Sequence, residues 1–164
     1  MGVTLYRLLN GDGFLRVARA ATPVDLQCAI TSGALPPRGA FEIHVHDALR
    51  RVARRAMHVD PVKRFQSAAE MRHSLEAARP NVSWSASVRA RTDLTWEGES
   101  IDGSTSWRAA ISAARGSAWD FRVERRLSGK SFRTVRSASG RFSDRDTAME
   151  HAPAVLQRIA VQGR

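Results

Sequence analysis

Residues 79–90 read Arg-Pro-Asn-Val-Ser-Trp-Ser-Ala-Ser-Val-Arg-Ala, and the pattern of the chain changes within them. From Val82 onward, apolar residues alternate with serine or arginine, which is typical of an antiparallel strand with one face in water. Before Arg79, apolar residues recur at spacings of three and four, which is typical of helices. The change predicts two domains, a helical one over residues 1–80 and one of strands over residues 81–164.

The alternation predicts a small antiparallel sheet in the second domain. The expected strands lie at residues 82–96, 107–113, 119–123 and around 132–135. The first run is longer than most strands, so a bend or break is expected near Asp93. A last helix is expected after Ser143 or Asp144. The predicted fold class is therefore α+β, with a helical part followed by a small antiparallel β-sheet packed with one C-terminal helix.

Local signals for helix starts and ends divide the first domain. Residues 3–9 are apolar on most sides, so we expect a buried helix that ends at Asn10 and Gly11. Three further helices follow, each begun by a polar residue whose side chain accepts a free backbone N–H. Their expected start signals are Thr22 with Pro23, Asp47, and Ser67 with Glu70.

The chain is strongly basic. It carries 26 Lys plus Arg against 16 Asp plus Glu, a net charge of +10, and only Lys63 and Lys130 are lysines. This excess of guanidinium groups suits acidic partners. No apolar run approaches the roughly 20 residues of a membrane span, and no secretory signal is visible. We therefore expect a cytoplasmic protein with no membrane partner.

A candidate interaction surface consists of six arginines: Arg89, Arg91, Arg122, Arg126, Arg133 and Arg136. Most of them occupy the alternate strand positions whose side chains are expected to face solvent. Such a surface suits contact with phosphates, so nucleic acid is one predicted partner. Asp120 and Glu124 alternate with two of these arginines, so ion pairing across a solvated sheet is the other explanation. The tryptophans at inward positions are expected in the core rather than under stacked bases.

The sequence predicts no metal, no cofactor and no nucleophilic catalysis. His44 and His46 lie two residues apart, whereas a zinc site takes three or four ligands, so we expect two solvated loop histidines. Cys28 is the only cysteine, and it lies among apolar residues of a predicted helix, where an inert core thiol is usual.

Two stretches of the first domain resemble the large lobe of bacterial-type serine/threonine protein kinases. Residues 2–11, Gly-Val-Thr-Leu-Tyr-Arg-Leu-Leu-Asn-Gly, are similar to the buried central helix of that lobe. Residues 48–75 resemble its last two helices, and the run Asp60-Pro61-Val62-Lys63-Arg64-Phe65 is the most specific part of the likeness. The resemblance covers residues 2–79 and implies a partial kinase large lobe.

The same resemblance implies no kinase activity for this polypeptide alone. Kinase catalysis needs a glycine-rich loop over ATP, a strand lysine, a catalytic-loop aspartate with its asparagine, and an Asp-Phe-Gly metal site, and the sequence contains none of these. Asp60, Pro61 and Arg64 are structural residues in this interpretation. In the family, the arginine that matches Arg64 is buried and pairs with a glutamate at the end of the activation segment. Here we expect Arg64 to be exposed, paired with Asp60 or Glu42, or paired with another chain.

The predicted function is that of a C-terminal portion of a kinase-like protein, with a regulatory or protein-binding role. Its predicted partner is another protein or the missing part of a kinase. The alternative is a basic nucleic-acid-binding module, because the order of helix, strands and helix is loosely similar to that of double-stranded-RNA-binding domains. Those domains carry a basic motif where this chain reads Ser143-Asp144-Arg145-Asp146, which departs from their pattern.

Overall fold

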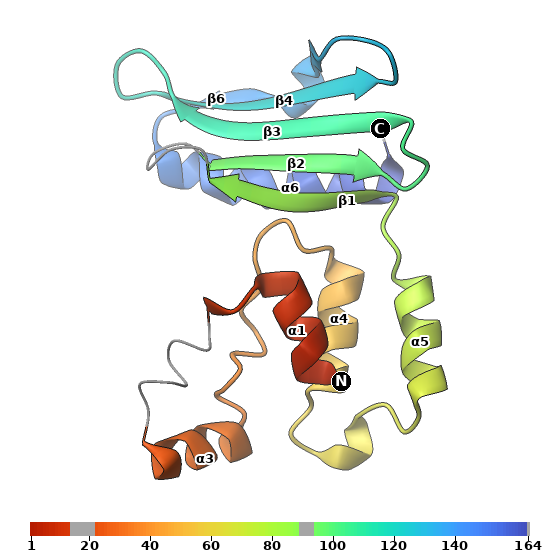
Figure 1. The fold of residues 1–164 in the computed structure, drawn as a ribbon. Helices are drawn as coiled ribbons and strands as arrows, with labels where there is room; N and C mark the ends of the chain where they lie inside the picture. Colours follow the sequence, from red (N-terminus) through yellow and green to blue (C-terminus); the bar gives the residue numbers. More distant parts are fainter. Residues whose placement is uncertain (14–21, 89–93, 164) are drawn as a thin grey trace. The chain divides into compact units, whose positions relative to one another are not determined.

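The computed structural model describes residues 1–13, 22–88 and 94–163, and the chain divides into two units, Met1–Arg79 and Pro80–Arg164 (Figure 1). We call them the helical unit and the sheet unit. The fold is α+β, as the sequence predicts: helices come first, and a six-stranded antiparallel sheet with a C-terminal helix packed on it follows.

The helical unit contains α1 (Gly2–Asn10), α3 (Pro23–Ser32), α4 (Asp47–Ala56), the 3-10 helix η1 (Pro61–Lys63) and α5 (Ala68–Ala77). The predicted caps of α3 and α5 are confirmed, because the Thr22 and Ser67 hydroxyls accept the backbone N–H groups of Asp25 and Glu70. The cap predicted for α4 is wrong by one position. His46 is its N-cap and Asp47 lies in the first turn.

The predicted capping box at α5 is half formed. The Ser67 hydroxyl accepts the Glu70 N–H at 3.1 Å, but the Glu70 carboxylate accepts the backbone N–H of Gln66 at 2.9 Å instead of that of Ser67. The same carboxylate pairs with Arg55 on α4. These contacts hold the pKa of Glu70 below its ordinary value, with the Gln66 hydrogen bond as the largest cause. Glu70 therefore links the start of α5 to α4.

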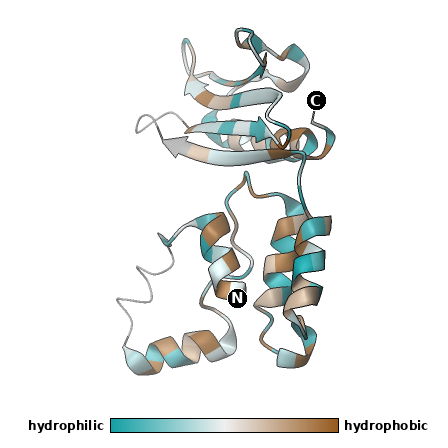
Figure 2. Ribbon diagram, turned by 45° about the vertical axis from the view of Figure 1, so that its right-hand side comes forward, coloured by the Kyte–Doolittle hydropathy of each residue, from teal (hydrophilic) through white to brown (hydrophobic). Residues whose placement is uncertain are grey.

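Helix α1 packs against the end of α4, but it is not buried as predicted. A Cβ on Gly2 would lie 2.6 Å from the Ala56 carbonyl oxygen, so the glycine permits the close approach of the two helices. Tyr6 is the buried residue of α1, and its hydroxyl donates to the Ala40 carbonyl at 3.0 Å. Leu8, in contrast, is 80% exposed, and Val3 is also exposed. Helix α1 includes hydrophobic residues (Figure 2), and two of them, Val3 and Leu8, have exposed side chains.

The sheet unit is built on an antiparallel sheet with strand order β1-β2-β3-β4-β5, in which β6 also pairs with β4. The strands are β1 (Val82–Val88), β2 (Leu94–Ser100), β3 (Thr105–Ala113), β4 (Trp119–Leu127), β5 (Arg133–Thr134) and β6 (Gly140–Phe142). The single run predicted over residues 82–96 is two antiparallel strands, β1 and β2. The predicted break near Asp93 falls between them, outside the described residues.

Helix α6 (Arg145–Gln162) lies on one face of the sheet (Figure 1). Its N-cap is Asp144, one of the two predicted residues, whose carboxylate accepts the Thr147 N–H at 2.8 Å. The core between sheet and helix includes the predicted inward tryptophans, all under 10% exposed: Trp84, Trp96 and Trp107. The other face of the sheet, which we call the open face, carries the alternating polar residues.

Candidate functional site

A pocket of about 510 Å³ in the helical unit combines apolar surface with two arginines. The start of α1, the end of α3 and the segment after α4 form its walls. Val3, Ile30 and Val59 line it, and each of them is more than two-fifths exposed. Arg38 and Arg64 line it as well, and we call it the Arg38–Arg64 pocket.

Arg38 is placed by the end of α3. Gly33 ends that helix in the left-handed conformation, with φ of 75°, where residues with a side chain are strained. The Arg38 side chain folds back over this turn and donates to the carbonyl oxygens of Ser32, Gly33 and Met57. A Cβ on Gly33 would overlap the Arg38 guanidinium, so the glycine is needed both for the turn and for the arginine.

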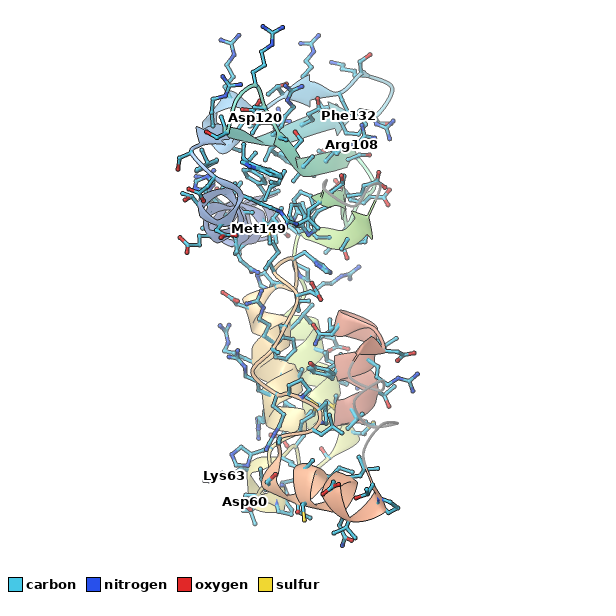
Figure 3. All side chains as sticks on the ribbon, turned by 90° about the vertical axis from the view of Figure 1, so that its left-hand side faces the viewer. Asp60, Lys63, Arg108, Asp120, Phe132 and Met149 are labelled. Carbon is cyan, nitrogen blue, oxygen red and sulfur yellow. The ribbon has the colours of Figure 1, made fainter. Side chains whose placement is uncertain are left out.

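Arg64 is placed by the turn that the kinase resemblance singles out. The Asp60 carboxylate caps η1 by accepting the Val62 N–H at 3.0 Å, and Pro61 occupies the first position of η1 (Figure 3). The Arg64 side chain donates to the carbonyl oxygens of His58 and Val59, at 2.6 and 3.1 Å. Arg64 is exposed within this chain, and neither Asp60 nor Glu42 forms an ion pair with it among the described residues. Pairing with another chain stays a prediction.

The charge of the Arg38–Arg64 pocket is entirely positive. Among the described residues, no carboxylate lines the pocket. Within the described residues, both guanidinium groups donate hydrogen bonds to neutral carbonyl oxygens. A carboxylate that enters the pocket would gain charge-assisted hydrogen bonds with them. The pocket therefore suits an apolar segment that carries an acidic side chain.

The six predicted surface arginines do not share one face. Arg122 and Arg126 lie on the open face, opposite Ala110 and Ser106 of β3. Arg133 pairs with Arg125 of β4, which has the opposite parity and lies on the helix-bearing face. Arg136 lies in η2 (Arg136–Ala138), and Arg89 and Arg91 lie outside the described residues. Of the described arginines, Arg133 therefore lies on the other face of the sheet from Arg122 and Arg126, because it lies opposite Arg125.

The open face has its own arginine cluster, of which the sequence predicts Arg126 but not Arg108 or its contact with Phe132. The guanidinium carbons of Arg108 and Arg126 lie 4.5 and 4.8 Å from the centre of the Phe132 ring (Figure 3). These residues and Glu97 line a groove of about 480 Å³. Arg126 also donates to Ser106, and Asp120 pairs with Arg141 at 2.9 Å. Much of the charge on this face is therefore paired within the sheet unit, as the ion-pair explanation expects.

The structure also corrects two predictions about single residues. Cys28 is exposed on α3, not buried, since α3 has no buried residue. His44 and His46 are partly buried rather than solvated, and burial is the largest cause that lowers the pKa of each. Among the described residues, no group of three His, Cys, Asp or Glu side chains is placed to hold a metal ion.

Comparison of the chain with family models, with curated proteins and with solved structures finds no match. None of the described helices combines the length and the apolar character that crossing a membrane requires.

Proposed function

We propose that this chain is a non-catalytic, protein-binding fragment of a kinase-like protein that acts in the cytoplasm. Its helical unit would use the Arg38–Arg64 pocket to hold an apolar segment with one carboxylate, from outside these 164 residues. The single observation that carries this proposal is the state of Arg64, which lines an apolar pocket and donates only to backbone carbonyls among the described residues.

The kinase resemblance identifies the chemistry of the segment. In that family, the arginine that matches Arg64 pairs with a glutamate at the end of the activation segment. Here Arg64 lies in the same pocket as the start of α1, the helix whose apolar side chains remain exposed. An apolar segment with a glutamate would cover part of the exposed apolar surface of α1, and its carboxylate would pair with Arg64. One bound segment would therefore account for both the exposed apolar side chains and the arginine without an anionic partner among the described residues.

The paired charges of the open face favour this role over the nucleic-acid alternative. A footprint for nucleic acid needs cations that are free to contact phosphates. Arg126 instead contacts Ser106 and Phe132, and Arg141 pairs with Asp120. The Arg141–Asp120 pair adds no net positive charge to this face, and the Arg126 side chain is held by contacts within the sheet unit.

The proposal is tested with the full chain and a fluorescent peptide of about 15 residues. The peptide spans the end of a bacterial kinase activation segment and contains its glutamate. We expect saturable binding by fluorescence polarisation. Replacement of the peptide glutamate by glutamine should weaken binding about tenfold, because the charge-assisted hydrogen bonds are lost.

Arg64→Ala should lower the affinity for the glutamate peptide to the affinity that the wild type has for the glutamine peptide. The matched control is Lys63→Ala, which removes a neighbouring exposed cation that does not line the pocket, and it should leave the affinity unchanged. No binding below about 1 mM, or equal affinity for the two peptides, overturns the proposal. Phosphorylation of a protein substrate by the purified chain with ATP and Mg²⁺ would overturn its non-catalytic part.

A further inference from the structure

One row of residues crosses the helix-bearing face of the sheet and ends in two arginines. In the register of the sheet, Trp84 lies opposite Gly98, Gly98 opposite Trp107, and Trp107 opposite Arg125. Arg125 in turn lies opposite Arg133 on β5. Like charges directly opposite each other on neighbouring strands destabilise a sheet. An anion beside the pair would relieve this repulsion.

The two ends of the row differ in their surroundings. At one end, the Trp84 indole N–H donates to the Leu156 carbonyl of α6 at 3.2 Å, so the helix covers it. At the other end, a pocket of about 510 Å³ contains both arginines, and we call it the Arg125–Arg133 pocket. Its volume lies in the range typical of small-ligand sites.

The lining of the Arg125–Arg133 pocket is rich in hydrogen-bond donors. Lys130 adds a third cation, and hydroxyl groups come from Ser131, Thr134 and Ser137. No carboxylate lines this pocket among the residues that the structure describes. In the same part of the chain, neither the two arginines nor Lys130 forms a side-chain ion pair.

Trp107 lines the same pocket. Its side chain is 98% buried, and its indole N–H has no hydrogen-bond partner in the described residues. The Arg125 guanidinium carbon lies 5.6 Å from the centre of the Trp107 ring. Because this N–H is itself buried, its signal would report on the pocket through the Arg125 side chain beside the Trp107 ring rather than through a contact with a ligand.

We propose that the Arg125–Arg133 pocket binds a phosphate group, either as inorganic phosphate or as the terminal group of a monoester. Such a group carries close to two negative charges near neutral pH and has three acceptor oxygens. Two arginines and a lysine match this charge, and the planar fork of arginine suits paired contacts with phosphate oxygens. A carboxylate offers one charge and two oxygens and would leave more of the donors unused.

The cations converge on one pocket, which distinguishes this site from a nucleic-acid footprint. A footprint follows a strand along the surface and involves many separate cations. Here three cations line a single pocket at the short strand β5. The arginines of the open face lie on the other side of the sheet, where they contact the chain itself.

The experiment titrates the full, ¹⁵N-labelled chain with inorganic phosphate, with O-phosphoserine and with serine. The four tryptophans give separate indole N–H signals in a two-dimensional NMR spectrum, and Trp107→Phe assigns the one of interest. We expect phosphate and phosphoserine to shift the Trp107 signal saturably, and serine to leave it unchanged. Tighter binding of phosphoserine than of phosphate indicates an esterified ligand, and equal binding indicates free phosphate. Both results support the site.

Variants locate the binding. Arg125→Gln and Arg133→Gln should each lower the affinity for phosphate about tenfold, because each removes a charge-assisted hydrogen bond. Arg122→Gln is the matched control, since Arg122 is an exposed arginine of the same strand with the opposite parity. Lys130→Gln, in an exposed turn, provides a second test if either pocket variant fails to fold.

Three results would overturn the proposal. The first is the absence of a saturable shift of the Trp107 signal. The second is an equal loss of affinity in Arg122→Gln and Arg125→Gln, which indicates unspecific attraction to a basic surface. The third is displacement of phosphate by a single-stranded oligonucleotide whose binding depends on Arg122 as much as on Arg125.

Discussion

Asp102 shows how single side chains fix the connections of the sheet unit. Its carboxylate lies between β2 and β3 and accepts hydrogen bonds from the Ser100 hydroxyl and from both the hydroxyl and the backbone N–H of Ser104. The Ser100 hydroxyl also accepts the Thr105 N–H at 2.9 Å, where β3 begins. These contacts, with that to Ser100 the largest cause, lower the pKa of Asp102 to about 2.

This depressed pKa predicts a stability that depends on pH. The folded pKa, about 2, lies below the ordinary value of 3.8, so Asp102 stabilises the fold above pH 3.8. That contribution is lost as the pH falls through about 2. Asp102→Ala should lower the urea midpoint of the tryptophan fluorescence transition near neutral pH and should match the wild type below about pH 2. A constant difference between the two proteins at every pH would contradict this account.

Gly98 sets the packing of two elements, because it lies between Trp84 on β1 and Trp107 on β3 in the same row. A Cβ at this position would lie 2.8 Å from the Trp84 ring, which α6 holds through Leu156. Gly98→Ala should therefore reduce the free energy of unfolding of the sheet unit by about 1 to 3 kcal/mol, the usual cost of overpacking.

Tryptophan fluorescence in a urea titration measures the effect of Gly98→Ala, because all four tryptophans lie in the sheet unit. The control is Gly39→Ala, since a Cβ on Gly39 meets no atom within 4 Å and its φ is not positive. A stability of Gly98→Ala equal to that of the wild type would show that the Trp84 ring moves aside without cost.

Sequence reasoning succeeded at elements whose cause is local. Thr22, Ser67 and Asp144 each begin a helix through a hydrogen bond within three residues, and such signals are visible in sequence. It did not predict β6, whose three residues pair with the distant strand β4, and it did not assign Arg133 to a face of the sheet. Both depend on contacts between residues far apart in the chain, which periodicity does not record.

Local motifs also predict one part of the candidate site, whereas the other part depends on contacts between distant segments. Arg64 was singled out, and its exposed state was among the expectations, because the turn at Asp60 and Pro61 is a local motif. Arg38 was missed. Its position depends on the left-handed turn at Gly33, which ends α3 and reverses the direction of the chain. After this turn, the Arg38 side chain donates a hydrogen bond to the Met57 carbonyl of another segment. A glycine that ends a helix five residues before an arginine was the only signal.

At the scale of the whole molecule, the division into two units predicts independent unfolding. Ala53 on α4 is fully buried in the helical unit, so Ala53→Asp places an unpaired carboxylate in that core. We expect loss of helical circular dichroism together with an unchanged tryptophan transition of the sheet unit. Arg51→Ala, at an exposed position of the same helix, is the control and should change neither signal. A lowered tryptophan midpoint in Ala53→Asp would show that the two units unfold together.

If Arg64 binds a carboxylate of a bound segment, a double-mutant cycle measures that contact. The affinities of wild type and Arg64→Ala for the glutamate and glutamine peptides give the coupling free energy between the two side chains. We expect a favourable coupling of at least about 0.5 kcal/mol, reduced at high salt because Arg64 is exposed. Additive effects, with a coupling of about zero, would contradict it.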